Sequence, residues 1–157
     1  MEVPLIEFKN VTKKFGERTI LDAVNLQIYD GHVTTIIGKS GTGKSVLLKH
    51  IIGLLSPTDG TIFFRGKPVH EMSRNAFDAF RSQFSYCFQN NALFDSLTVF
   101  GNIALPLQHT TKLGKKDVEK KVMEKMEQLD IGGLSDKYPS ELSGGMQKRV
   151  ALARALV

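Results

Sequence analysis

The sequence predicts an α/β fold with strands near the N-terminus, a parallel core sheet and a helical subdomain. Residues 4–11 and 18–29 alternate apolar and polar side chains, as half-buried strands do. The apolar, β-branched run "VTTIIG" at 33–38 is typical of a strand buried on both faces of a parallel sheet, so it is predicted to be the central strand. Residues 114–131 instead carry apolar side chains at helical spacing.

The elements after the central strand are predicted from their start and stop signals. A helix is expected over about residues 44–54, where "SPTDG" ends it, and 60–69 is expected to form a strand and a turn. Ser73 is predicted to cap a short helix that runs through Arg81. The apolar run "QFSYCF" at 83–88 is predicted to be another buried strand.

Residues 90–142 are predicted to form a helical subdomain inserted within one domain, because no Pro/Gly/Ser-rich linker divides the chain. Thr98 is predicted to cap its first long helix. The next helix places apolar residues on one stripe, which we interpret as core packing rather than a ligand site; its lysine-rich remainder is interpreted as a solvated face. The stripe consists of Val118, Val122, Met126 and Leu129.

The composition is that of a folded globular chain. Of its 157 residues, 41% are hydrophobic and 24% are charged, which argues against disorder. The 21 basic residues exceed the 16 acidic ones, and this excess fits phosphate ligands, nucleic acid or an anionic membrane surface without choosing among them. No apolar stretch is long enough for a signal peptide or a membrane span, so any membrane role is expected to come through a partner.

Cysteine and histidine usage argues against a disulfide or a metal centre made of protein ligands alone. Cys87 is the only cysteine, which favours a reducing compartment, and we interpret it as a small buried hydrophobe. The histidines are scattered, without cysteines or carboxylates at ligand spacing. They are His32, His50, His70 and His109.

The segment "GKSGTGKS" at 38–45 matches the P-loop pattern GxxxxGK[ST] in full, between a predicted strand and a predicted helix. Its glycines let successive backbone N–H groups point at phosphate oxygens, and the positive end of the following helix adds to the attraction. Lys44 is expected to reach the β- and γ-phosphates, and the Ser45 hydroxyl to bind Mg²⁺. The pattern therefore predicts a nucleoside triphosphate site. Its predicted binding residues are Gly38, Lys39, Ser40, Gly41, Thr42, Gly43, Lys44, Ser45 and Val46.

Four further stretches narrow this prediction. They are "KKFG" with Phe15, "CFQNNALF" with Gln89, "LSGG" at 142–145 and "RVALARAL" at 149–156. In this order they resemble the adenine-stacking loop, Q-loop, signature loop and signature helix of ABC transporter ATPases, and the resemblance covers nearly the whole chain. It implies an ABC-type P-loop NTPase with N-terminal antiparallel strands, a parallel core sheet and an inserted helical subdomain.

The same resemblance implies a division of the chain and the roles of its residues. Within a partial ABC ATP-binding domain at 1–157, a nucleotide-binding core is expected at 1–89, a helical subdomain at 90–142, and a signature loop and helix at 143–157. The implied cofactors are ATP and Mg²⁺. Its implied site residues are Lys44 and Gln89 as catalytic groups, Ser45 and Gln89 as Mg²⁺ ligands, and Phe15 as the ring that stacks on adenine.

The signature loop is expected to act on a second copy of the chain. In ABC ATPases two subunits meet head to tail, so Ser143, Gly144 and Gly145 would face the γ-phosphate of the partner's ATP, where a helix N-terminus favours negative charge. A helix N-cap followed by a flexible turn would have the same sequence without any ligand. The loop sequence alone therefore does not distinguish a ligand-binding loop from an ordinary helix cap. Met146 stands where ABC proteins usually carry Gln, which removes one polar contact of the loop.

A narrower resemblance points to a transport system. "LSGGM" together with "ALFDSLTVFGNIALPL" at 92–107 is similar to the ATPases of Mla-type lipid transporters, which work with MCE substrate-binding proteins on phospholipids. It implies an integral membrane permease that contacts the region after Gln89, an MCE-type protein as a further partner, and no nucleic acid. The expected location is the cytoplasmic, inner face of the plasma membrane, where the permease holds the subunit peripherally.

ABC ATPases continue past the signature helix into an apolar strand that ends in Asp-Glu, and the sequence reaches Val157 without one. We therefore expect the chain to be the N-terminal part of a longer ATPase and, by itself, inactive in hydrolysis. Two alternatives stay open beside a transporter subunit. One is a nucleotide-binding fragment without hydrolysis, and the other is a soluble, non-transport ABC ATPase acting on nucleic acid or ribosomes, which usually has paired ATPase domains or long coiled-coil insertions.

Overall fold

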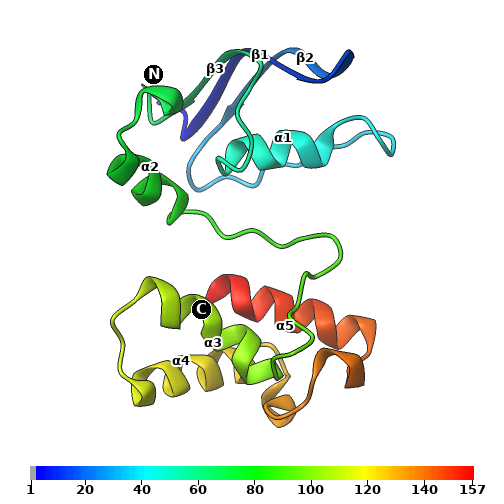
Figure 1. Cartoon of the computed structure of the whole chain (residues 1–157), viewed down its shortest axis with the longest axis vertical. Coiled ribbons are helices and arrows are strands. Elements are labelled where there is room, and N and C mark those ends of the chain that lie inside the picture. The colour runs from blue at the N-terminus through cyan, green and yellow to red at the C-terminus, as the bar shows by residue number, and fades with distance from the viewer. Residues whose placement is uncertain (1–2) are drawn as a thin grey trace. The chain divides into compact units, whose positions relative to one another are not determined.

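The computed structural model describes residues 3–157 as two compact units (Figure 1). The first, here called unit 1, ends at Phe84, and the second, unit 2, is Ser85–Val157. Each has its own hydrophobic core and is described by itself.

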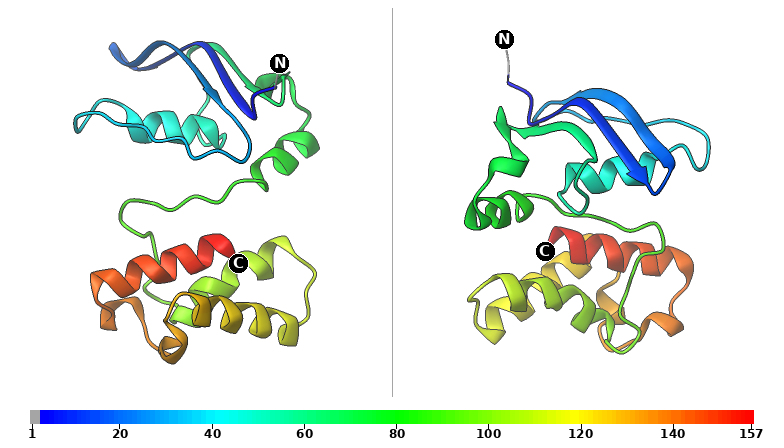
Figure 2. Two further views of the ribbon diagram at one scale, coloured as in Figure 1. Left: turned by 180° about the vertical axis from the view of Figure 1, so that it is seen from behind. Right: turned by 45° about the horizontal axis from the view of Figure 1, so that its top comes forward.

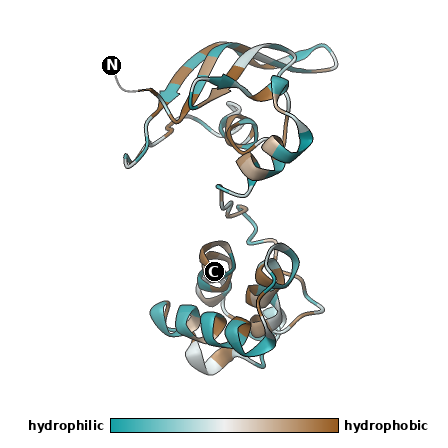
Figure 3. Ribbon diagram, turned by 90° about the vertical axis from the view of Figure 1, so that its left-hand side faces the viewer, coloured by the Kyte–Doolittle hydropathy of each residue, from teal (hydrophilic) through white to brown (hydrophobic). Residues whose placement is uncertain are grey.

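Unit 1 is built on an antiparallel sheet with strand order β2-β1-β3-β4. Strands β1 (Ile6–Phe15) and β2 (Arg18–Ile28) are the two half-buried strands predicted from the alternating pattern, and Figure 3 shows hydrophobic and hydrophilic residues alternating along them. Strands β3 (Asp59–Phe64) and β4 (Lys67–Pro68) confirm the predicted strand and turn.

A bulge in β1 depends on a glycine of β3. The pairing of the two strands shifts register between Lys9 and Thr12, and Asn10 adopts a positive φ of 51°. Gly60 lies against this bulge with φ +81°, and a Cβ at that position would collide with the Asn10 carbonyl group. Only glycine therefore lets the backbones of β1 and β3 approach so closely.

Helices α1 (Lys44–Ile51) and α2 (Arg74–Arg81) complete the core of unit 1, with a short 3-10 turn at Val69–Glu71 between them. The Oγ of Ser73 accepts a hydrogen bond from the N–H of Ala76, which confirms the predicted cap of α2. Helix α1 is shorter than predicted and ends at Ile51. The core consists of Ile6, Phe8, Val11, Leu21, Leu47, Ile51, Ile62, Phe64 and Phe80.

The prediction of buried strands at 33–38 and 83–88 is wrong, because both segments lack regular secondary structure. The side chains of Val33 and Ile37 are 97% and 89% exposed, and Phe88 is 40% exposed. An apolar, β-branched run becomes a buried strand only where neighbouring strands pair with its backbone on either side. Among residues 3–157 no strand pairs with these two segments, so a parallel core sheet does not form within that range.

Unit 2 is helical, with long helices α3 (Val99–Thr110), α4 (Lys115–Gln128) and α5 (Gly144–Leu156). The Oγ1 of Thr98 accepts a hydrogen bond from the N–H of Gly101, which confirms the predicted cap. The predicted stripe of α4 lies in the core, except that Leu129 is only partly buried. The stripe residues that are buried are Val118, Val122 and Met126.

Two short 3-10 turns, at Gly132–Leu134 and Pro139–Glu141, lie between α4 and α5. Val150 and Ala153 of α5 pack into the same core as α3 and α4.

The division into parts at 1–89, 90–142 and 143–157 stays a prediction. Within residues 3–157, every helix is too short or too polar to cross a membrane.

Candidate nucleotide-binding site

The P-loop, residues 38–45, precedes α1 at the same end of unit 1 as the tip of the β1–β2 hairpin (Figures 1 and 2). Gly41 and Gly43 have φ of +81° and +92°, in the left-handed region that favours glycine. A Cβ on Gly43 would lie 3.0 Å from the Ile20 carbonyl oxygen and 3.2 Å from Leu21 Cδ2. Glycine thus lets the loop close onto β2.

The N-terminus of α1 is open to an anion. Gly43 is its N-cap and has no side chain to accept a hydrogen bond, and the first turn contains no acidic residue. The backbone N–H groups of this turn therefore have no side-chain acceptor, and the helix dipole is positive at this end. Ser45 is exposed in the same turn. This arrangement suits a phosphate group.

The ammonium group of Lys44 lies over the loop that precedes it. Its Nζ donates to the carbonyl oxygens of Gly38 at 2.8 Å and Lys39 at 2.7 Å. The Thr42 hydroxyl also donates to the Lys39 carbonyl, at 2.9 Å, which tightens the loop. No carboxylate of residues 3–157 forms an ion pair with Lys44. The loop thus holds an unneutralised positive charge among glycines, as triphosphate binding requires.

Phe15 is the last residue of β1 and lies at the hairpin tip, opposite Arg18. Its ring is 50% exposed, so it is not a core residue. The Nζ of Lys13 lies 5.2 Å from the ring centroid, at the distance of a cation–π contact. An exposed aromatic ring at the P-loop end of unit 1 has the chemistry that stacking on a base needs.

Gln89 lies exposed in a turn of unit 2, before a short segment that α5 holds in place. The Arg154 guanidinium donates to the carbonyl oxygens of Asn91 and Ala92, both at 2.8 Å. Burial lowers the pKa of this guanidinium. The sequence analysis does not identify Arg154, although its basic side chain between the apolar residues of "VALARAL" is a signal for it.

Cys87, just before Gln89, is exposed rather than buried, so its interpretation as a core residue is wrong. Its Sγ lies 3.9 Å from the carbonyl oxygen of Ala151, to which it donates a weak hydrogen bond. The segment around it, residues 84–88, has no regular secondary structure, and a segment without paired strands beside it cannot bury its side chains on both faces.

The signature loop forms the start of α5. Ser143 is the N-cap, and its Oγ accepts a hydrogen bond from the N–H of Met146 at 3.3 Å. Gly144 and Gly145 are exposed and do not have positive φ. A Cβ on Gly144 would meet nothing within 4 Å, and one on Gly145 would meet only Ser143 Oγ, at 4.0 Å. Among residues 3–157, no neighbouring atom therefore requires glycine at these two positions.

Gln147 anchors the loop from inside the helix. Its Nε2 donates to the carbonyl oxygen of Pro139 at 3.0 Å. Glu141 accepts a hydrogen bond from the N–H of Tyr138 at 2.7 Å, which closes the 3-10 turn before the loop. Met146, by contrast, is 40% exposed. The loop is thus held without the glutamine that usually follows its glycines.

The structure brings together some of the predicted site residues. Phe15 and residues 38–46 share one end of unit 1, whereas Gln89 and residues 143–145 belong to unit 2. The pairing of Ser45 with Gln89 as Mg²⁺ ligands, like the other assigned roles, therefore stays a prediction.

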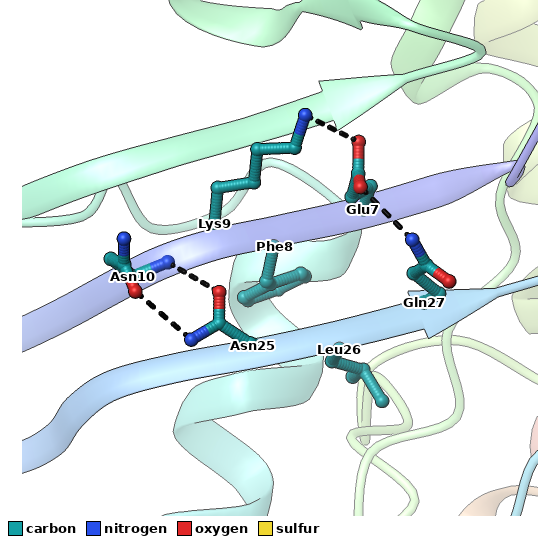
Figure 4. Close-up of a pocket in the computed structure, with 7 residues that line it drawn as sticks. All are labelled: Glu7, Phe8, Lys9, Asn10, Asn25, Leu26 and Gln27. Atoms are coloured by element: carbon teal, nitrogen blue, oxygen red, sulfur yellow. Dashed lines mark hydrogen bonds and ion pairs between the residues drawn. The ribbon is translucent and has the colours of Figure 1, made fainter.

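A hollow of about 470 Å³ lies over β1 and β2, and its lining includes no residue of the P-loop (Figure 4). Its polar side chains satisfy one another. Glu7 accepts from Gln27 Nε2 at 3.0 Å and pairs with Lys9 at 3.3 Å, and the amides of Asn10 and Asn25 bond to each other. The hydrogen bond from Gln27 lowers the pKa of Glu7. The hollow thus offers a ligand few free polar groups, and we assign no site to it.

Comparisons with known proteins agree with this geometry. The family model described as ABC transporter matches residues 21–157. The chain is 45% identical over 152 residues to the probable ribonucleotide transport ATP-binding protein mkl of Mycobacterium leprae, covering 97% of this chain and 44% of that protein. It is 42% identical to the intermembrane phospholipid transport system ATP-binding protein MlaF of Haemophilus influenzae, covering 99% of this chain and 59% of MlaF.

Solved structures give the same result. The dimeric structure of MJ0796, a bacterial ABC transporter cassette, matches with a TM-score of 0.85 and 33% identity, covering 96% of this chain and 68% of that one. Its post-hydrolysis state, bound to ADP and Pi, matches with a TM-score of 0.84. The chain spans about half the length of the curated relatives it matches.

Proposed function

The chain belongs to the ABC transporter family, and we propose that it is the ATP-binding part of a subunit that couples ATP hydrolysis to transport through a separate membrane permease. The observation that carries this proposal is the P-loop. Its glycines close it onto β2, Lys44 holds an unneutralised charge over it, and an uncapped helix N-terminus follows.

The residues of unit 1 fit ATP with Mg²⁺. Lys44 and the N–H groups of the first turn of α1 would hold the β- and γ-phosphates, and the Ser45 hydroxyl would bind the metal. Gln89, the second proposed Mg²⁺ ligand, belongs to unit 2. Phe15 would stack on the adenine. The bound nucleotide supplies the phosphoanhydride bond that is broken, and the chain's own groups orient it and stabilise its charge.

The signature loop is proposed to act across a head-to-tail dimer. Among residues 3–157, no contact requires glycine at 144 or 145, and glycine is the residue that lets another molecule approach the backbone most closely. A phosphate of the partner's ATP meets this requirement, since α5 presents its positive end there. The dimeric form of MJ0796 supports this arrangement.

The proposed substrate is a phospholipid, because MlaF relatives carry that assignment in their names and match 99% of this chain. The permease is proposed to contact the segment after Gln89, which Arg154 ties to α5, with an MCE-type protein as a further partner. The subunit would then lie at the cytoplasmic face of the inner membrane. The mkl relative makes ribonucleotides a second candidate substrate.

The substrate proposal is tested by reconstituting the intact protein with its permease in liposomes. ATP should drive transfer of a labelled phospholipid between vesicles, and Lys44→Ala should abolish the transfer. If other ribonucleotides stimulate ATP hydrolysis and no phospholipid is transferred, ribonucleotides would be favoured as the substrate.

Phe15→Ala is expected to weaken ATP binding by roughly 1–3 kcal/mol, the usual contribution of an aromatic ring stacked on a base. The melting temperature should change little because the ring is half exposed. Calorimetric titration with Mg-ATP measures the first effect and thermal unfolding the second. Phe94→Ala is a matched control, since Phe94 is 51% exposed and also faces a cation, Arg154 at 6.0 Å. Unchanged ATP affinity in Phe15→Ala would remove the stacking assignment.

A further inference from the structure

Lys13 is a basic residue at the hairpin tip to which the proposed ATP site gives no role. Its Nζ lies over the ring of Phe15, 5.2 Å from the ring centroid. The face of an aromatic ring carries partial negative charge and attracts a cation at this distance. No carboxylate of residues 3–157 forms an ion pair with Lys13. The positive charge over the ring is therefore not neutralised by an acidic neighbour.

A hydrogen bond fixes the position of this ammonium group. The Lys13 Nζ donates to the carbonyl oxygen of Ser56 at 2.7 Å. Ser56 belongs to the loop between α1 and β3, far from Lys13 in the sequence. A lysine side chain is long and flexible, and binding its end removes much of its rotamer freedom. The Ser56 carbonyl thus keeps the cation beside the ring.

The same loop also holds the backbone of β1 just before Phe15. The Thr58 N–H donates to the carbonyl oxygen of Thr12 at 2.8 Å, and the Thr58 Oγ1 accepts a hydrogen bond from the Lys14 N–H at 3.0 Å. Phe15 follows as the last residue of the strand. With the backbone fixed in this way, the orientation of the half-exposed ring depends on what its side chain contacts.

We propose that Lys13 is a positioning residue for adenine binding. Its ammonium group, anchored on the Ser56 carbonyl, holds one face of the Phe15 ring and leaves the opposite face to stack on the base. A ring without this contact would spend part of its time in rotamers that cannot stack, and ATP affinity falls in proportion to the fraction of competent rings. This inference rests on the proposed function, because it requires that Phe15 stacks on adenine.

A direct contact with the phosphates is the other way in which this cation could strengthen ATP binding. Such a contact would act on tripolyphosphate as much as on ATP, because both ligands carry the same chain of phosphates. A residue that positions the stacking ring acts only on the ligand that has a base. The ratio of ATP affinity to tripolyphosphate affinity therefore separates the two roles.

The test measures this ratio by calorimetric titration of the intact protein, without Mg²⁺ so that ATP is not hydrolysed. Lys13→Met keeps a straight side chain and removes the charge. The ratio should fall about two- to fivefold, the factor that corresponds to an exposed cation–π contact. A contact that only stabilised the fold would change the melting temperature and leave the ratio as it is. An unchanged ratio would overturn the proposal.

Two variants serve as controls for the charge and its geometry. Lys14→Met removes the same charge from the next residue, whose ammonium group lies over no ring in the described part of the chain, and its ratio should equal that of the wild type. Lys13→Arg should also keep the ratio near the wild-type value, because a guanidinium group stacks on an aromatic face and donates to a carbonyl oxygen. A ratio as low in Lys13→Arg or Lys14→Met as in Lys13→Met would contradict the assigned contact.

Combining Lys13→Met with Phe15→Ala shows whether Lys13 acts through the ring. Once the ring is absent, Lys13→Met should have no further effect on the ratio. An undiminished effect in the Phe15→Ala background would make the proposal wrong. If Phe15→Ala lowers the ratio and Lys13→Met does not, stacking by Phe15 stands and only the role of Lys13 is wrong. If Phe15→Ala leaves the ratio unchanged, the stacking assignment is wrong and the role of Lys13 is wrong with it.

Discussion

Lys44→Ala is expected to weaken ATP binding by at least about 100-fold, because a charge-assisted contact with the phosphates is lost. The Lys44 ammonium lies within 2.8 Å of the carbonyl oxygens of both Gly38 and Lys39. With the lysine truncated, these carbonyl dipoles would face the phosphates without a positive charge between them. Calorimetric titration with Mg-ATP measures the effect.

Lys49→Ala is the matched control for this experiment. It removes the same charge from the same helix, but from its last turn, away from the P-loop. Its ATP affinity should stay close to that of the wild type, and both variants should melt near the wild-type temperature. Equal affinities of Lys44→Ala and wild type would mean that the P-loop is not the nucleotide site.

Gly144→Asp is expected to slow ATP hydrolysis by the intact protein by on the order of 100- to 1,000-fold while leaving ATP binding to the isolated subunit nearly unchanged. The P-loop is untouched, and the new carboxylate would face the γ-phosphate across the dimer interface, where like charges repel strongly in a desolvated site. Steady-state turnover and ATP-driven cross-linking of the dimer measure the two consequences.

The structure makes misfolding a poor explanation for such a loss. A Cβ on Gly144 would enter open space, and an acidic residue in the first turn of a helix is stabilising. Gly133→Asp is the matched control, because Gly133 is also exposed, has no neighbour within 4 Å of a Cβ, and lies outside the signature loop. It should hydrolyse ATP at the wild-type rate.

Mixing variants separates action across the dimer from action within one subunit. In a dimer of Gly144→Asp with Lys44→Ala, head-to-tail pairing puts both defects into one composite site and leaves the other site intact. About half of the wild-type turnover is then expected if the two sites work independently. If Gly144→Asp alone dimerises with ATP and turns over normally, the loop does not act on the partner's nucleotide.

Local signals in the sequence predicted local structure well. The caps at Ser73 and Thr98 form the hydrogen bonds expected of them, and the stripe of α4 faces the core through Val118, Val122 and Met126. The P-loop pattern likewise predicted the glycine turn before α1. In each case the signal is contained in one short stretch of sequence, as a capping residue, an apolar spacing or a glycine pattern, so the local chain encodes the geometry.

Burial was predicted poorly wherever it depends on distant segments. The apolar runs at 33–38 and 83–88 have the composition of buried strands, yet Val33 and Ile37 are almost fully exposed. Hydrophobicity says that a segment would gain by burial, but only a paired neighbour can satisfy its backbone and cover its faces. That neighbour is a property of the tertiary structure.

The sequence by itself determined the family, the P-loop turn before α1, the antiparallel N-terminal strands and the helices of unit 2. Each of these depends on contiguous residues or on the order of short motifs. Only the tertiary structure showed that Phe15 is exposed and that Arg154 holds the segment after Gln89. These features depend on contacts between residues far apart in the chain, and the spacing of residue types does not record such contacts.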